Sequence, residues 1–231
     1  MWAWALLPIS LTVWSTAGIW IVYEIAVSNG SVNVTENFPS ISKCGTYPPQ
    51  SCIFGQILNV GAILVIWIIV IRFQQIRDYG CCSPVNSWGL AIGFLSALGT
   101  SIVGNFQTSN AHVMHLIGAF LAFIFGTIYF WIQTALTCMV KRRHGGYWMV
   151  VLRCILTVFA TALIIMMIVF SLMEMKSAAA ICEWITAMIL FVLFGFFCVD
   201  FWFLDGLFLH VIKRMVVIPN EVQVSTVTQS L

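Results

Sequence analysis

Six long apolar runs constrain this chain more than any other feature of its sequence. They lie near residues 3–27, 53–71, 87–104, 113–139, 150–172 and 180–204. A helix needs about 20 residues to cross roughly 30 Å of hydrocarbon, and the runs have about this length. Within lipid every backbone polar group must be satisfied internally, which helices achieve. The sequence therefore predicts an all-α integral membrane protein, a six-helix transmembrane bundle.

Composition excludes several other classes of protein. Only 8% of the 231 residues are charged, against about a quarter in soluble domains. The net charge of +2 is small and the basic residues are scattered, so we expect a lipid bilayer as partner and no nucleic acid. The six runs fill a membrane domain over residues 1–204. Residues 205–231 remain as a tail, and no room is left for a soluble catalytic domain.

Basic residues predict the orientation of the bundle. Seven lie in the loops at 72–86 and 140–149 and in the tail, and two lie in the opposite loops. The seven are Arg72, Arg77, Lys141, Arg142, Arg143, Lys213 and Arg214, and the two are Lys43 and Lys176. Cytoplasmic loops carry the excess of Lys and Arg, so both termini are expected in the cytosol. The first run lacks a preceding basic residue and exceeds a signal-peptide core in length, so we expect it to be retained.

The longest outward loop, residues 28–52, carries two N-glycosylation patterns. Asn29 begins Asn-Gly-Ser and Asn33 begins Asn-Val-Thr, so both are predicted glycosylation sites. Alternatively, closeness to the first span keeps the transferase away. The same loop holds Cys44 and Cys52 around a turn-rich stretch, and we predict a disulfide between them. The alternative is two free cysteines, one of them entering the second helix.

Other cysteines suggest a lipid modification or packing. Cys81 and Cys82 follow the second run on the cytosolic side and are candidates for S-palmitoylation. Four further cysteines lie in or at the ends of spans and are interpreted as small packing residues. The third run contains Gly89 and Gly93 as a GxxxG pattern, which we interpret as packing within the bundle rather than as a dimer face.

Acidic and histidine residues do not form an evident catalytic or metal site. Asp200 follows Glu183 by 17 residues, or about 25 Å of helix, so the two acids cannot act as a pair. We expect Glu183 to anchor the last helix by accepting hydrogen bonds from first-turn N–H groups, or alternatively to contact His115. His112 and His115 lack a third ligand nearby, so no metal site is predicted. Hydrolase, phosphate-loop and HExxH patterns are lacking, so we expect neither an enzyme nor a cofactor.

Four short strings carry a resemblance to a known family. They are FPSISKCGTYPPQSCIF at 38–54, VGNFQ at 103–107, a lone histidine at His115, and ICEW at 181–184. In this order and spacing they resemble the damage-regulated autophagy modulator (DRAM) family, in particular its transmembrane protein 150 branch. LLPISLTVWSTAGIWIVYEIAVSN at 6–29 and ALGTSIVGNFQ at 97–107 are most similar to the B-type members. The matching positions are candidates for folding or partner contact, namely Pro48, Pro49, Gly104, Asn105, Phe106, Gln107, His115, Cys182, Glu183 and Trp184.

The resemblance implies a function that composition does not show. It implies six spans and residence in plasma, endosomal, lysosomal or autophagosomal membranes. It also implies regulation of macroautophagy, vesicle trafficking and cell survival under nutrient stress, through membrane or cytosolic protein partners that the sequence does not identify. Two alternatives stay open: a membrane adaptor that recruits a phosphoinositide kinase, and an ion channel or channel modulator. The family offers no catalytic residues to transfer.

Overall fold

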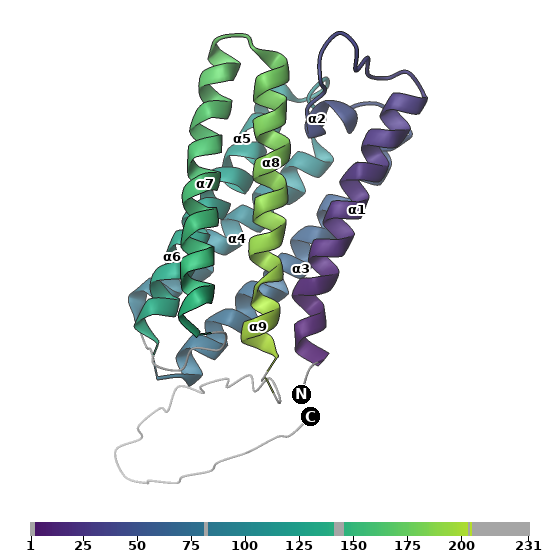
Figure 1. Cartoon of the computed structure of the whole chain (residues 1–231). Coiled ribbons are helices and arrows are strands. Elements are labelled where there is room, and N and C mark those ends of the chain that lie inside the picture. The colour runs from purple at the N-terminus through teal and green to yellow at the C-terminus, as the bar shows by residue number, and fades with distance from the viewer. Residues whose placement is uncertain (1–2, 81–82, 141–145, 203, 205–231) are drawn as a thin grey trace, which may run out of the picture.

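The computed structural model describes residues 3–80, 83–140, 146–202 and 204. All regular elements within these residues are helices, and six helical segments are long and apolar enough to cross a membrane (Figure 1). The predicted fold class, an all-α bundle with six spans, is confirmed.

Each span is one helix or a short series of helices. The first span joins η1 (Ala3–Ala5) to α1 (Leu6–Ser28), and α2 (Ile41–Cys44) lies in the following loop. The second and third spans are α3 (Gln50–Asp78) and α4 (Pro84–Asn105). The fourth joins α5 (His112–Phe120), a π-helical turn η2 (Leu121–Phe125) and α6 (Gly126–Met139). The fifth is α7 (Gly146–Leu172), and the sixth joins α8 (Lys176–Gly195) to α9 (Phe197–Phe201).

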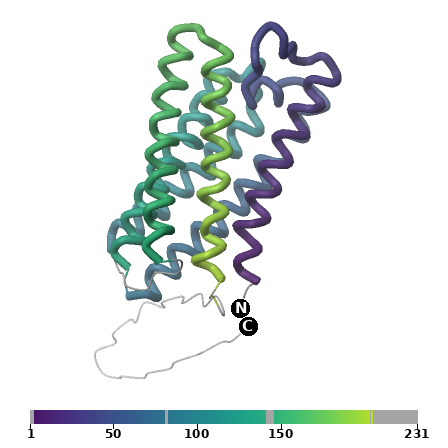
Figure 2. The backbone as a smooth tube through the Cα atoms, viewed as in Figure 1, coloured from purple at the N-terminus to yellow at the C-terminus, as the bar shows by residue number. Residues whose placement is uncertain are grey.

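The spans pack in chain order around a closed ring. α3 packs against α1 and α4, α4 against the α5–η2–α6 span, α6 against α7, α7 against α8, and α8 against α1. Figure 2 shows the start of α1 and the end of α9 at the same end of the bundle. We call this end the inner end and the end that carries α2 the outer end, following the predicted orientation.

Several helices extend beyond their apolar runs. α3 continues to Asp78, seven residues past the predicted end at 71, and α8 begins at Lys176 rather than at 180. Arg72 was therefore wrongly placed in a loop: it lies inside α3 and its side chain is buried. The helix continues because Arg72 and the neighbouring Gln75 find polar partners within the protein.

Glycines on α4 bring neighbouring helices close. A Cβ atom at Gly93 would lie 2.7 Å from Ile69 of α3, and one at Gly99 would lie 2.5 Å from the backbone nitrogen of Ala122. Gly89 faces Ile132 on α6. The GxxxG pattern thus packs within the bundle, as interpreted from the sequence.

Candidate functional site

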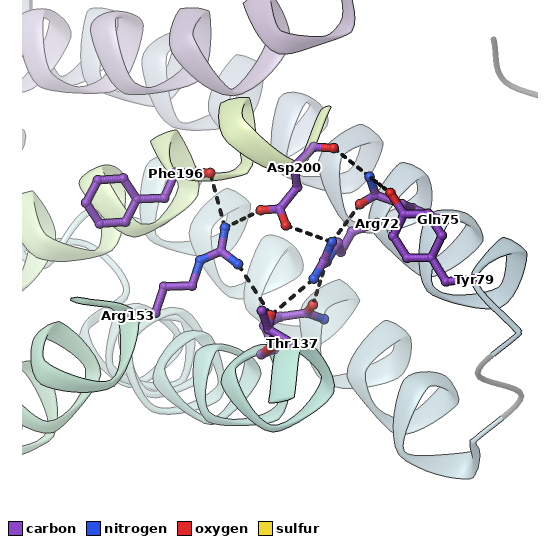
Figure 3. A network of polar contacts seen from close by, with 8 residues as sticks. Arg72, Gln75, Tyr79, Thr137, Arg153, Phe196 and Asp200 are labelled. Atoms are coloured by element: carbon purple, nitrogen blue, oxygen red, sulfur yellow. Dashed lines mark hydrogen bonds and ion pairs between the residues drawn. The ribbon is translucent and has the colours of Figure 1, made fainter. Parts of the chain in front are cut away.

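Two arginines and one aspartate meet inside the inner end of the bundle (Figure 3). Nη1 of Arg72 lies 3.0 Å from Oδ1 of Asp200, and Nη2 of Arg153 pairs with Oδ2 of the same carboxylate. The exposed fraction of each side chain is 6% or less. We call these three residues the arginine–aspartate cluster.

Neutral oxygens on other helices accept further hydrogen bonds from the two guanidinium groups. Arg72 donates through Nε to Gln133 at 3.2 Å and through Nη2 to Thr137 at 3.2 Å. Arg153 donates through Nη1 to the same Thr137 hydroxyl at 3.4 Å and through Nη2 to the Phe196 carbonyl at 3.1 Å. These contacts connect α3, α6, α7 and the junction of α8 with α9.

Gln75 closes the network on the side of α3. Its Oε1 accepts from Nη1 of Arg72 at 2.6 Å, and its Nε2 donates to the backbone carbonyl of Asp200 at 2.6 Å. The same Nε2 donates to the Tyr79 hydroxyl at 3.2 Å. Asp200 is thus held by its side chain and by its backbone, which fixes the last turn of the sixth span.

The charges of the cluster are not balanced. Two cations share one anion, which leaves a formal charge of +1 in a region with little water. Both guanidinium carbons lie over the ring of Phe197, at 5.7 Å for Arg72 and 5.1 Å for Arg153, which offers cation–π attraction. Removing one partner of a buried ion pair typically destabilises a protein by about 3–5 kcal/mol. The cluster is therefore expected to be sensitive to the loss of a charged partner.

Sequence reasoning missed this cluster. It counted Arg72 as a loop residue, passed over Arg153, and treated Asp200 only as too distant from Glu183. A signal was present: with alternating spans, the end of the second, the start of the fifth and the end of the sixth lie at the same membrane face. Charged residues inside membrane segments are rare and pair with one another. Because Arg72, Arg153 and Asp200 lie at a similar depth in the membrane, an ion pair between them can be predicted.

The loop at the outer end is docked against the bundle rather than free. The indole N–H of Trp184 donates to the Pro39 carbonyl at 3.0 Å, and the backbone N–H of Phe38 donates to the Ser177 hydroxyl at 3.1 Å. The Trp184 ring also packs on Trp20 and Tyr23 of α1, with centroid distances of 4.7 and 5.7 Å. Trp184 thus ties the loop to the first and sixth spans.

Glu183 anchors the same loop, but not in the expected way. It lies two turns into α8, and its Oε1 accepts hydrogen bonds from the backbone N–H and the hydroxyl of Ser42, both at 3.3 Å. The expected bond to first-turn N–H groups of its own helix is wrong, because α8 begins earlier than its apolar run. His115, the alternative partner, instead has Nδ1 at 2.7 Å from the Phe106 carbonyl.

The remaining motif positions form tight turns and close contacts. A Cβ at Gly104 would lie 3.3 Å from Cα of Gly55, so α3 and α4 nearly touch there. Asn105 donates to Asn59 at 3.0 Å and to the Ser101 carbonyl at 2.7 Å. The backbone carbonyl of Gln107 accepts hydrogen bonds from two N–H groups of the following turn. Pro48 and Pro49 directly precede α3, and Cys182 is buried. These contacts favour a role in folding for the motif.

The candidate modification sites differ in their surroundings. Asn29 and Asn33 are both exposed. Cys44 is buried, and burial together with the nearby Glu183 charge raises the pKa of its thiol to about 12. Cys52 is exposed, and the structure holds both as free thiols, so the disulfide stays a prediction, as do the glycans. Cys81 and Cys82 lie outside the described residues.

Six apolar spans, a buried charge cluster at one end and a docked loop at the other define a multi-pass α-helical membrane protein. Among the described residues no group of three or more His, Cys, Asp or Glu could hold a metal ion. Residues 3–204 match the family described as Frag1/DRAM/Sfk1/Cwh43P N-terminal domain, and the chain belongs to this family. The resemblance found in the sequence is confirmed.

Similar proteins share a descriptive name. "Modulator of macroautophagy TMEM150B-B" of Xenopus laevis is 67% identical over 231 residues, covering 100% of both chains. The proteins named "Modulator of macroautophagy TMEM150B" in Mus musculus and Homo sapiens are 54% and 48% identical. The mouse alignment covers 91% of this chain and 90% of the relative, and the human one 87% of each. No solved structure matches the chain.

Proposed function

We propose that this chain is a membrane-embedded modulator of macroautophagy. The observation that carries the proposal is its 67% identity, over its whole length, to a protein named for that role. The proposal extends to vesicle trafficking and to cell survival under nutrient stress. We place the protein in plasma, endosomal, lysosomal and autophagosomal membranes, where it acts through protein partners rather than by catalysis.

The inner end of the bundle is the proposed output side. The arginine–aspartate cluster holds the last turn of the sixth span against α3 and α7. Residues 205–231 follow this turn in sequence. The cluster therefore holds in place the helix turn that precedes the tail. A partner that recognises the tail and the neighbouring loops would then find them at a defined place on the membrane.

The test is rescue of autophagic flux. In cells that lack the protein, turnover of a lysosome-delivered reporter is measured during amino-acid starvation, with and without blocked lysosomal degradation. Re-expression of the wild-type chain is expected to restore flux, and a chain that ends at residue 204 is expected to reach the same membranes without restoring it. Flux that is unchanged by loss of the protein would contradict the proposed function. Full rescue by the shortened chain would contradict the role of the tail.

A further inference from the structure

A cavity lies inside the bundle and extends from the outer end past the middle of the spans. It has a volume of about 110 Å³ and is lined by residues of all spans except the fifth, with α2 at its outer end. Its wall is almost entirely apolar. Thr100 and Ser96 on the wall donate their hydroxyls to carbonyls of the protein, at 3.0 and 3.2 Å. We call this space the outer cavity.

The outer cavity is elongated along the bundle. Its lining runs from Phe54 to Val65 on α3 and from Glu183 to Phe194 on α8, which is about 16 Å of helix in each case. Apolar cavities of similar volume stay dry and accept apolar guests. A small volume spread over this length suits one unbranched alkyl chain better than a fused-ring body.

One charged group faces the outer end of this apolar channel. Glu183 lines the cavity, is half-buried, and accepts two long hydrogen bonds from Ser42. The carboxylate of Asp200 is paired with two arginines, whereas among the described residues no basic side chain forms an ion pair with Glu183. A carboxylate removed from water is costly unless it is paired or hydrogen-bonded. An ionised carboxylate has about four acceptor positions on its two oxygens, so Glu183 can accept a further hydrogen bond from the head group of a ligand.

We propose that the outer cavity binds a single-chain amphiphile whose head group is a hydrogen-bond donor. The alkyl chain occupies the channel between α3 and α8, and a hydroxyl or ammonium head donates to the Glu183 carboxylate beside Ser42. The surrounding bilayer is the source of the ligand. Long-chain alcohols and long-chain amines share this chemistry, and their carboxylic acid counterpart does not, because its charge would face Glu183. The proposal does not rest on the function in macroautophagy.

The experiment uses the purified full chain in lipid nanodiscs and three photoactivatable probes. Each carries the same alkyl chain of about 16 Å with a crosslinking group at its middle, and ends in an amine, an alcohol or a carboxylic acid. We expect the amine, the alcohol or both to label peptides that line the cavity, at least about tenfold more than the acid, a difference of about 1.4 kcal/mol. The probe that labels more strongly identifies the head group. Equal labelling by all three would overturn the proposal.

Matched variants separate the cavity from the lipid-facing surface. A Cβ at Gly61 would lie 3.6 Å from Oγ of Ser15 and meets no backbone. Gly61→Leu is therefore expected to fill the channel and abolish labelling, and Gly61→Ala to leave most of it. Glu183→Gln is expected to weaken amine labelling about tenfold, whereas Glu24→Gln, at an exposed acid of the outer end, should not. Labelling unaffected by Gly61→Leu would show binding to the outer surface and overturn the proposal.

A competition experiment keeps the test independent of variant folding. With the wild-type chain, unlabelled long-chain amine or alcohol is expected to displace its probe, and the unlabelled acid of equal length is not. Displacement by the acid as strong as by both donors would contradict a donor-specific site.

Discussion

At the level of single residues, removing the charge of Asp200 and removing the charge of one arginine should affect stability differently. Removing the carboxylate leaves Arg72 and Arg153 as two buried cations that repel each other. Removing one arginine leaves one ion pair with no net charge. Because the cluster has two cations and one anion, loss of the anion should destabilise the protein more than loss of one cation.

We predict that Asp200→Asn lowers the free energy of unfolding by about 3–5 kcal/mol and that Arg72→Met lowers it less. The reason is that Asp200 can still pair with Arg153 in the second variant. Denaturant unfolding of the purified protein in mild detergent measures both. Asp78→Asn, at an exposed acid of the same end, is the control and should be within about 0.5 kcal/mol of wild type. Equal losses for all three variants would refute the ranking.

Cys44 gives a prediction about pH. Its thiol has a pKa raised from 9.0 to about 12, first by burial and second by the Glu183 charge. The thiolate is the reactive form, so at pH 8 only about one Cys44 thiol in ten thousand is ionised. After reduction, exposed Cys52 should react with a maleimide at pH 8, and Cys44 should react only as pH approaches 12 or on unfolding. Mass spectrometry of the labelled peptides reads the result, and rapid Cys44 labelling at pH 8 would contradict it.

At the level of elements, the outer loop depends on two contacts from α8. Trp184 holds the Pro39 carbonyl, and Glu183 holds the start of α2 through Ser42. An amide oxygen accepts hydrogen bonds as a carboxylate does. We therefore predict that Glu183→Gln keeps the loop docked and Glu183→Leu releases it.

Limited proteolysis within residues 29–49 measures this difference. Cleavage should rise several-fold for Glu183→Leu and little for Glu183→Gln, with Glu24→Leu as a control at an exposed acid of α1. If Glu183→Gln cleaves as fast as Glu183→Leu, the charge rather than the hydrogen bonds holds the loop.

The two glycosylation patterns in the same loop have different surroundings. The side-chain nitrogen of Asn29, the atom that would carry the sugar, donates to Gln50 at 2.9 Å, and Asn29 sits at the end of α1. Both side-chain oxygens accept from the hydroxyl of their own pattern, Asn29 from Ser31 at 2.6 Å and Asn33 from Thr35 at 2.7 Å, but Asn33 lies four residues further from the end of α1. We predict that Asn33 carries the glycan. Asn33→Gln should remove the glycosidase-sensitive gel shift and Asn29→Gln should not; the reverse pattern would contradict this.

Sequence reasoning predicted the elements better than the contacts between them. The apolar runs revealed all six spans because lipid requires length and hydropathy, which are local properties. Their ends were less accurate, because hydropathy treats a charge such as Arg72 as the end of a span. Its partner Asp200 is 128 residues away, so pairing becomes visible only once the ring of helices is known. Likewise, the sequence did not reveal the hydrogen bonds between Glu183 and Ser42, because the two residues are 141 positions apart. It suggested only a bond within the helix of Glu183 itself.

At the level of the whole molecule, the buried arginines change the argument for orientation. Arg72 and Arg153 lie inside the bundle, where their charges are held by protein partners. Without them the inner side keeps six basic residues: Arg77, Lys141, Arg142, Arg143, Lys213 and Arg214. The outer side keeps two, Lys43 and Lys176. The excess of basic residues still predicts that the inner end faces the cytosol.

The final prediction is therefore that both termini are cytosolic and the loop that carries Asn33 faces outward or into the lumen. In intact cells with the protein at their surface, an antibody should detect a tag inserted after Val34, an exposed loop residue, and should detect terminal tags only after permeabilisation. The ring of six spans requires the two ends of the membrane domain to share one side, so detection of only one terminus in intact cells would contradict the six-span bundle itself. Detection of both termini, without the loop, would instead leave the bundle intact and reverse its orientation, which would contradict the prediction from the basic residues.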